Sequence, residues 1–269
     1  MPEWPDLQVV RGRIATALTG RRIVAVRIGD PVVLRATRPI DELLVGRRLD
    51  GVRHRGKFLL FDLDDASTMV VNPMLSGVFA LVPAGTRVST DTRLRLEFEG
   101  GDELRYRDDT RMGKIYLGAP APGLAETGPE AGAPGWTFDE FAARAKARRM
   151  ELRNLLMDQR FIGGIGNAYA DEILWDARLH PKRRIGSLTA DELARLHGSV
   201  RDVIAAAVAE VERAMPPALG TKPRDHLRIR GRAGGPCPRC GATIKRVRSG
   251  LGEVDLCPGC QPAPKGQLY

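Results

Sequence analysis

The sequence has few aromatic residues, few cysteines and no long hydrophobic run. Aromatic side chains make up 5% of the 269 residues, and all four cysteines follow residue 236. No segment approaches the roughly 18 consecutive apolar residues that a membrane-spanning helix needs. The first residues lack the basic and apolar stretches of a signal peptide, so we expect a cytoplasmic protein whose thiols stay reduced. Four clustered cysteines then indicate metal ligands and not disulfides.

What the sequence does have is enough apolar material for packed cores and an excess of positive charge. Hydrophobic residues form 43% of the chain, which excludes disordered, collagen-like and knottin-like proteins. Lys and Arg number 42 against 33 Asp and Glu, for a net charge of +9. This balance favours a polyanionic partner, and charge alone does not choose between a nucleic acid and an anionic membrane surface.

The first half of the chain has the pattern of a β-rich domain. A short helix is expected over residues 7–19, and runs of strand length and strand composition follow it. The expected strands are 23–28, 57–63, 68–72, 94–98 and 115–117.

The second half changes to a helical pattern after a segment of unusual composition. Residues 118–135 are nearly all Gly, Pro, Ala and Glu, which predicts a linker that does not pack. Beyond it, Thr137 with Glu140 and Thr189 with Glu192 have the spacing of capping boxes at the starts of helices. A domain boundary is therefore expected within the linker.

The cysteines form two matched pairs with the spacing of a structural zinc site. Cys237 and Cys240 make one C-x-x-C pair, and Cys257 and Cys260 make the other. Two such knuckles can present four thiolates tetrahedrally to one Zn²⁺, which leaves the metal no open position for chemistry. A redox dithiol and an iron–sulfur site are weaker alternatives, because the βαβ context and the ferredoxin spacing are missing.

A glycine-rich turn separates two helical patterns. In Gly163–Asn167, glycines can free backbone amides and Asn167 can cap the next helix. Amides that converge on a helix N-terminus bind anions, and in a basic protein a DNA phosphate is a suitable anion. A tight helix connection without a ligand stays an alternative. A dinucleotide site has little support, since no strand precedes the turn.

The N-terminus and one lysine are candidates for covalent chemistry and phosphate binding. Removal of Met1 would expose the secondary amine of Pro2 beside the Glu3 carboxylate. An α-amine with a pKa of about 7.8 is a far better nucleophile at neutral pH than an ordinary lysine. Lys57 heads an expected strand at the edge of its apolar face, where it could hold a phosphate. For both residues an alternative without chemistry stays open: Pro2 only begins the chain, and Lys57 is an ordinary surface lysine.

Taken in order, these motifs resemble the formamidopyrimidine-DNA glycosylase and endonuclease VIII family over nearly the whole chain. The family implies an α+β fold, in which an N-terminal β-sandwich with a flanking helix is followed by a helix-two-turn-helix domain and a four-cysteine zinc finger. The motifs are Pro2-Glu3, the Arg-x-x-Gly-Lys-x-Leu-Leu run that contains Lys57, Arg111 after Asp108-Asp109, Leu155-Leu156-x-Asp158-Gln159, Gly164-Ile165-Gly166-Asn167-x-Tyr169-Ala170-Asp171-Glu172, and the terminal finger that closes with Cys260-Gln261.

The resemblance implies a domain division and an activity. We expect a catalytic β-sandwich domain over 1–117, a linker over 118–136, a helix-two-turn-helix domain over 137–221 and a zinc finger over 222–269. The implied activity is bifunctional: a DNA glycosylase excises oxidised or otherwise damaged bases, and an abasic-site lyase nicks the strand. The implied partner is double-stranded DNA with damaged bases or abasic sites, bound by a monomer. Such a protein would act in the cytoplasm, at the nucleoid in a bacterium.

Site roles follow by the same resemblance. The nitrogen of Pro2 would attack the sugar C1′, and Glu3 would move protons for ring opening. Lys57 and Asn167 match the family's phosphate-holding positions. Leu75, Arg111 and Met112 match the positions whose side chains enter the vacated base stack. The ligands of the structural zinc are matched by Cys237, Cys240, Cys257 and Cys260.

The finger departs from the family at its tip. Five residues before the third cysteine, the family usually has a phosphate-gripping arginine, and this sequence has Gly252. Glu253 and Asp255 beside it add negative charge. Either Arg248 or its neighbour Arg246 takes over the phosphate contact, or the finger holds DNA loosely and the enzyme acts on unusual substrates.

Other departures affect the choice of substrate. Only a short stretch, 215–226, precedes the finger, which leaves little room for the lesion-capping loop of purine-specific members. Substrate choice therefore stays open, and a catalytically weak DNA-binding protein on the same scaffold is the main alternative. A zinc-ribbon adaptor unrelated to repair would leave the β-rich half unexplained. The substituted family positions are Asp6, Leu75, Met112 and Trp4.

Overall fold

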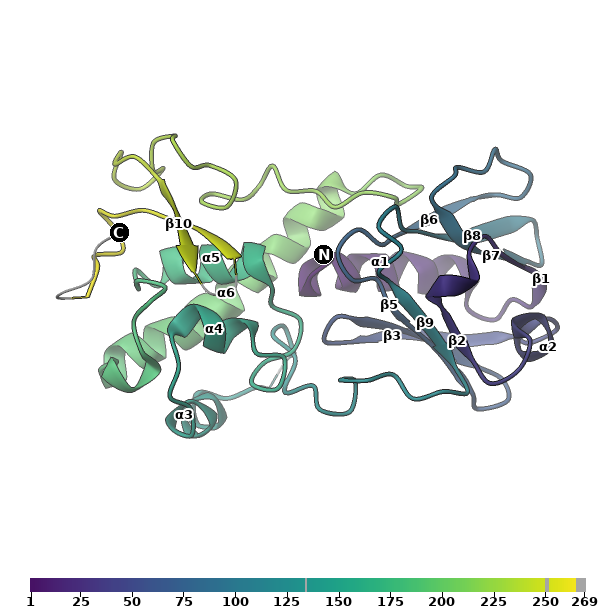
Figure 1. Ribbon diagram of the computed structural model, residues 1–269, viewed down its shortest axis with the longest axis horizontal. Coiled ribbons are helices and arrows are strands. Elements are labelled where there is room, and N and C mark those ends of the chain that lie inside the picture. The colour runs from purple at the N-terminus through teal and green to yellow at the C-terminus, as the bar shows by residue number, and fades with distance from the viewer. Residues whose placement is uncertain (134, 250–251, 265–269) are drawn as a thin grey trace. The chain divides into compact units, whose positions relative to one another are not determined.

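The computed structural model describes residues 1–133, 135–249 and 252–264 (Figure 1). These residues form two compact units: one contains residues 1–125 and 211–223, and the other contains residues 126–210 and those from 224 onward. The four-part division expected from the sequence stays a prediction. Among the described residues, no helix is long and apolar enough to cross a membrane.

The first unit consists of two β-sheets, the helices α1 and α2 and the end of a helix from the second unit. One sheet has the strand order β1-β7-β8-β6, and the other has the order β2-β9-β5-β4-β3. All pairs are antiparallel except β2 with β9, which run parallel. The elements are α1 (Trp4–Leu18), β1 (Ile23–Ile28), β2 (Leu34–Ala36), α2 (Ile40–Leu44), β3 (Leu49–Arg55), β4 (Phe58–Leu63), β5 (Thr68–Asn72), β6 (Val78–Pro83), β7 (Thr92–Phe98), β8 (Asp102–Arg107) and β9 (Lys114–Leu117).

Aromatic contacts show that the two sheets pack face to face. Phe61 on β4 lies 5.9 Å from Phe79 on β6, measured between ring centroids. Phe79 in turn lies 5.4 Å from Tyr106 on β8. All three rings are buried, so the core of this sandwich forms between the inner faces of the two sheets. The predicted sandwich is confirmed.

Several boundaries in this unit differ from the predictions, and two of them affect candidate site residues. The first helix begins at Trp4 and not at residue 7, because Pro5 at its second position suits a helix start and Glu3 with Asp6 forms a capping box. Lys57 does not head a strand. It occupies the two-residue turn between β3 and β4, whose pairing closes at Arg55 opposite Phe58.

The Gly/Pro-rich segment packs more than its composition suggested. Thr127 and Ala131 are buried, so the expectation that this segment cannot pack is wrong here. Gly128 donates its N–H to the carbonyl of Gln159, and Ala131 donates to that of Gly163. Small residues allow this close approach: a Cβ on Gly128 would lie 2.5 Å from the carbonyl oxygen of Arg160.

The second unit is helical and has an aromatic core. Trp136, Phe141 and Phe161 contact one another through their edges. The buried His197 joins them and contacts the carbonyl of Trp136 at 3.2 Å. The helices are α3 (Phe138–Lys146), α4 (Leu152–Met157), α5 (Asn167–Asp176) and α6 (Ala190–Ala214), of which α6 extends into the first unit.

Both predicted capping boxes are present. The Thr137 hydroxyl accepts the N–H of Glu140, whose carboxylate accepts the N–H of Thr137, at the start of α3. Thr189 and Glu192 make the same reciprocal pair at the start of α6. Each box satisfies amides that a helix end otherwise leaves without partners.

Candidate active site and nucleic-acid interface

The start of the chain is built into the first unit. Pro2 and Glu3 are buried, whereas Met1 is exposed. Asp6 accepts the backbone N–H of Glu3 at 2.8 Å from one turn into α1, and its side chain is 1% exposed. The sequence had marked Asp6 only as a departure from the family. The structure shows that it fixes the backbone on which Pro2 and Glu3 sit.

The ammonium group of Lys57 interacts electrostatically with the Glu3 carboxylate of this N-terminal segment. Gly56 before it has φ +55°, which a two-residue hairpin of type II′ requires at its first position. The turn leaves Lys57 half-buried. Burial lowers the pKa of Lys57 below its ordinary value, and the nearby Glu3 carboxylate opposes that shift. Glu3 and Lys57, predicted as site residues from distant sequence positions, therefore lie close enough to interact electrostatically.

A histidine links the same hairpin to α1. The ring of His54 on β3 meets that of Trp4 edge to face at a centroid distance of 5.1 Å. Its Nε2 bonds the side-chain oxygen of Gln8 at 3.0 Å. Burial, with a further contribution from the positive charge of Arg11, lowers the pKa of His54 to about 4. The neutral His54 and the bulky Trp4 thus hold the Lys57 hairpin against the beginning of α1.

Three side chains predicted to enter the base stack project from two loops of the first unit. Leu75 lies in the loop between β5 and β6, which we call loop 73–77, and is 48% exposed. Arg111 and Met112 lie in the loop between β8 and β9, which we call loop 108–113, and Met112 is 43% exposed. Two large apolar side chains are thus accessible at the tips of neighbouring loops, as insertion into a base stack requires.

Two lysines hold the backbones of these loops. Lys222 donates from Nζ to the carbonyl of Leu75 at 3.0 Å. Lys114 donates to the carbonyls of Met112 and Gly113, each at 3.1 Å. The residues before Lys222 are themselves anchored, because the carbonyl of Ala218 accepts the N–H of Leu81 on β6.

The glycine turn of the second unit has a different construction from the one predicted. Gly163 donates its N–H to the carbonyl of Pro129, and Gly164 donates to the side chain of Gln159. These two amides are therefore not free for an anion. Gln159 also donates to the carbonyl of Ile165 at 2.8 Å, so one amide side chain closes the turn.

Asn167 does not cap α5, because the helix begins at Asn167 itself and Gly166 is the N-cap. Arg153 instead donates to Oδ1 of Asn167 at 2.7 Å. With the amide oxygen occupied, the hydrogen-bonding capacity that Asn167 offers a ligand is that of its NH₂ donor. Asn167 is exposed at the first turn of a ten-residue helix, where the positive end of the helix dipole favours anions.

A buried ion-pair network joins Asn167 to the finger. Arg153, 1% exposed, lies 3.1 Å from Asp171, and Arg230 lies 2.9 Å from the same carboxylate. Both arginines also donate to the carbonyl of Glu253. Burial raises the pKa of Asp171 to about 6, and the two arginines oppose the shift. The network fixes β11 (Gly252–Leu256), a strand of the finger, against α5.

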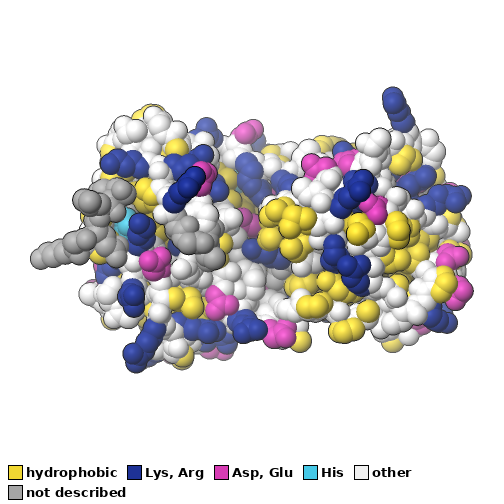
Figure 2. All heavy atoms as spheres, viewed as in Figure 1, with side chains coloured by type: hydrophobic (Ala, Val, Ile, Leu, Met, Phe, Trp, Pro, Cys, Tyr) yellow, Lys and Arg dark blue, Asp and Glu magenta, His cyan; other side chains and the backbone are white. Residues whose placement is uncertain are grey.

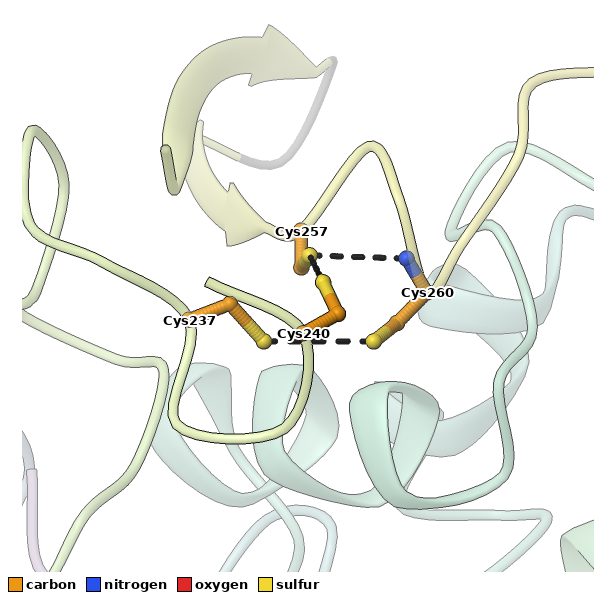
Figure 3. A group of neighbouring side chains, drawn as sticks. All are labelled: Cys237, Cys240, Cys257 and Cys260. Atoms are coloured by element: carbon orange, nitrogen blue, oxygen red, sulfur yellow. Dashed lines mark hydrogen bonds between the residues drawn. The ribbon is translucent and has the colours of Figure 1, made fainter. Parts of the chain in front are cut away.

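The four cysteines gather as the spacing predicted (Figure 3). Their sulfur atoms lie within 4.8 Å of one another. Sulfur atoms in a tetrahedral zinc site are separated by about 3.8 Å, given Zn–S bonds of about 2.3 Å. Cys237 and Cys260 match this spacing at 3.8 Å, and Cys240 and Cys257 lie 3.4 Å apart. The donor set fits a structural Zn²⁺, which would tie the ends of the β10–β11 hairpin together.

The finger is a hairpin docked on α5. Its strands are β10 (Lys245–Ser249) and β11 (Gly252–Leu256). The indole N–H of Trp175 points at the sulfur of Cys237, at 3.4 Å, and the guanidinium of Arg239 lies 4.0 Å from the centroid of the Trp175 ring. Gln261 donates to the carbonyl of Leu179, so the residue after the last cysteine also anchors the finger.

The two candidate arginines near the tip of the finger differ in their ion pairs. Arg246 is paired with Asp255, from Nε at 2.7 Å and from Nη2 at 2.9 Å, and also lies near Glu253. Arg248 is exposed opposite Glu253 in the hairpin register. Gly252 has φ +105°, a conformation that disfavours an arginine side chain at that position. Of the two predicted substitutes, Arg248 is the one whose guanidinium has no ion pair among the described residues.

Sequence reasoning missed the residues that position the site. Arg153 lies one residue after Leu152 and two before Leu155 in a helical stripe, and a charged residue there signals a buried ion pair without naming its partner. Asp171 and Arg230 carry no such signal, because their meeting depends on how α5 and the finger pack.

The match with known proteins covers the chain from end to end. Residues 1–115 match the formamidopyrimidine-DNA glycosylase N-terminal domain, residues 127–215 match the formamidopyrimidine-DNA glycosylase H2TH domain, and residues 234–263 match the zinc finger found in FPG and IleRS. The chain is 34% identical to the formamidopyrimidine-DNA glycosylase of Moorella thermoacetica over 92% of its own length and 95% of that protein. It is also 34% identical to the Salinispora arenicola enzyme of that name, over 100% and 99% of the two chains.

Solved structures have the same fold. A complex between Lactococcus lactis Fpg and DNA containing an abasic site superposes with a TM-score of 0.87 at 24% identity, over 97% of this chain and 100% of that one. The β-sandwich, the helix-two-turn-helix unit and the four-cysteine finger together define the class of zinc-finger DNA glycosylases. Within that class, the chain belongs to the formamidopyrimidine-DNA glycosylase family.

Proposed function

We propose that the protein is a bifunctional DNA glycosylase and abasic-site lyase of base excision repair, with Pro2 as its nucleophile. The observation that carries the proposal is the buried Pro2-Glu3 segment, fixed by Asp6 and charge-coupled to Lys57. The substrate is double-stranded DNA that contains an oxidised or otherwise damaged base. The protein works as a monomer in the cytoplasm, where DNA is available to it.

The chemistry begins once Met1 has been removed, because the amide nitrogen of a retained Met1–Pro2 bond is not nucleophilic. The free amine of Pro2 bonds to C1′ as the bond from C1′ to the base breaks and the base departs with a proton. Glu3 moves the proton that allows the sugar ring to open, which leaves an iminium ion on the open sugar. Loss of a C2′ proton then expels the 3′ phosphate, and water releases the sugar from Pro2.

The remaining predicted residues serve binding. Lys57 and Asn167 hold phosphates of the damaged strand, the former as a point charge and the latter through its NH₂ group. Leu75, Arg111 and Met112 enter the space left by the rotated nucleotide, since a stacked nucleotide hides its C1′ from attack.

The zinc finger supplies further phosphate contacts. Arg248 is an exposed cation on β10, and Lys and Arg side chains are numerous on the face shown in Figure 2. The zinc held by Cys237, Cys240, Cys257 and Cys260 keeps the hairpin folded and takes no part in the reaction.

A panel of duplexes tests the activity. Wild-type protein with a native N-terminus is incubated with duplexes containing an oxidised purine, an oxidised pyrimidine or an abasic site, with and without borohydride. The proposal requires strand cleavage of the abasic duplex and of at least one lesion, and a borohydride-stable adduct. Tight binding without cleavage would instead support a catalytically weak DNA-binding protein, the candidate that Gly252 at the finger tip favours.

A further inference from the structure

Loop 73–77 and loop 108–113 are joined by one buried carboxylate. Asp108 is 1% exposed and stands at the start of the second loop. Its Oδ1 accepts the hydroxyl hydrogen of Ser76 from the first loop, and also the backbone N–H of Thr110 at 3.2 Å and its hydroxyl at 2.9 Å. The hydroxyls of Ser76 and Thr110 lie 2.7 Å apart, so the bonds cross directly from one loop to the other.

The second oxygen of Asp108 fixes the far end of its own loop. Oδ2 accepts the N–H of Gly113 at 2.7 Å. Although burial alone would raise the pKa of Asp108, hydrogen bonds from Ser76, Gly113 and Thr110 hold it below its ordinary value. The group is therefore an ionised, multiply bonded acceptor, the form in which a carboxylate makes its strongest hydrogen bonds.

The space around this carboxylate is closed by two glycines and a tyrosine. The Tyr106 hydroxyl lies 3.4 Å from Oδ2 of Asp108 and 3.5 Å from the carbonyl oxygen of Pro73. A Cβ on Gly113 would lie 1.8 Å from that hydroxyl, and one on Gly77 would lie 2.5 Å from it. The two loops thus meet at one packed point and can hardly move past each other there.

The residues predicted to enter the base stack are the immediate neighbours of this point. Leu75 directly precedes Ser76, and Arg111 and Met112 lie between Thr110 and Gly113. Arg111 has φ +56°, a left-handed conformation that costs free energy for a residue other than glycine. Hydrogen bonds to Thr110 on one side and Gly113 on the other maintain that conformation, so the backbone from which the Arg111 side chain projects is held in place.

We propose that Asp108 is a positioning residue that sets the spacing between the two loops, so that their side chains enter the duplex together. The inference rests on the proposed function, in which those side chains replace the rotated nucleotide. Because both loops bind one carboxylate, the backbones that carry the three inserting side chains form one rigid unit. The loops then lose no conformational entropy when their side chains enter the duplex. Preorganised contacts raise affinity and rate because they avoid this cost.

The test compares abasic DNA that must be opened with abasic DNA that need not be. Asp108→Asn is measured beside Asp109→Asn, a matched control at an exposed neighbouring carboxylate. The readout is the rate of borohydride trapping on an abasic strand, alone and in duplex with its complement. We expect Asp108→Asn to lower the duplex rate by about 10- to 100-fold, a typical cost of misplaced groups, and to leave the single-strand rate within about twofold. Equal loss on both substrates, or no loss on duplex, overturns the inference.

A second variant and a second readout keep the test decisive. Ser76→Ala removes only the hydroxyl that crosses between the loops, and its duplex-selective loss should match that of Asp108→Asn and not add to it in the double variant. Fluorescence of a 2-aminopurine opposite the abasic site reports insertion without any chemistry. If wild-type protein raises this fluorescence but traps no DNA, the proposed activity fails while the positioning claim is still judged by the variants. If the variants raise the fluorescence as wild type does, the positioning claim fails.

Discussion

Arg153 donates a hydrogen bond of 2.7 Å to the side-chain oxygen of Asn167 and belongs to the buried network that also holds β11 of the finger. One arginine therefore orients a predicted phosphate ligand and fixes the adjacent finger strand. Because a guanidinium can bond in several directions at once while a lysine ammonium is a point charge, no lysine reproduces this arrangement.

Arg153→Lys should weaken binding to an abasic-analogue duplex through Asn167. We expect a loss of about 10-fold, since one oriented hydrogen bond to a charged group contributes roughly 1.5 kcal/mol or more. In an Asn167→Ala background the same change should add little. The measurement is a double-mutant cycle on the dissociation constant, with Arg149→Lys at an exposed position as control. Fully additive losses would show that Arg153 does not act through Asn167.

Replacement of Lys57 should impair catalysis and shift its pH dependence. Lys57→Met should lower kcat/KM on an abasic duplex by about 100-fold, a typical cost for one electrostatic contact in an active site. The pKa of Lys57 is lowered by burial, so the wild-type side chain loses its charge at a lower pH than an ordinary lysine does. Activity should therefore fall on the alkaline side below pH 10.5, and this fall should vanish in Lys57→Arg. An alkaline limb that is identical in both proteins contradicts the assignment.

The sequence predicted elements that depend on local pattern and missed those that depend on distant packing. β1 and β5 have the predicted bounds, and both capping boxes and the cysteine cluster are present, because spacing along the chain determines them. The position of Lys57 in a turn was missed, since strand composition continues through its neighbours. The roles of Arg153 and Asp108 could not be predicted, because their partners become neighbours only after the units have folded.

Removal of zinc should weaken DNA binding without unfolding the first unit. The four cysteines close the hairpin that carries Arg248, and a hairpin this small depends on its metal to stay folded. Metal analysis should find one Zn²⁺ per chain, and treatment with a chelator that extracts it should raise the dissociation constant for duplex DNA at least 10-fold. The control is the far-ultraviolet circular dichroism of the β-rich unit, which should persist. Binding unaffected by complete zinc loss would contradict the structural role.

The Arg183–Glu192 pair at the start of α6 should contribute stability that acid removes. A hydrogen bond from Arg183 and the N–H of Thr189 lower the pKa of Glu192 to about 2. A carboxyl with a lowered folded-state pKa stabilises the fold above its ordinary value of about 4.5, and the contribution is lost as the pH falls toward 2. Glu192→Gln should therefore lower the urea midpoint at pH 6 and change it little near pH 2.5. Asp191→Asn at the neighbouring exposed position is the control, and an equal loss at both pH values contradicts the prediction.

The central claim is that the amine of Pro2 attacks deoxyribose, and the most direct measurement is borohydride trapping by two forms of the protein that differ only at the N-terminus. Intact mass spectrometry first identifies a form that lacks Met1 and a form extended by a residue that cannot be removed. On an abasic duplex, the form with free Pro2 should give a covalent adduct whose DNA-linked peptide begins at residue 2. The extended form should give none. Equal trapping by the extended form, or an adduct mapped to a lysine such as Lys57, would contradict the account.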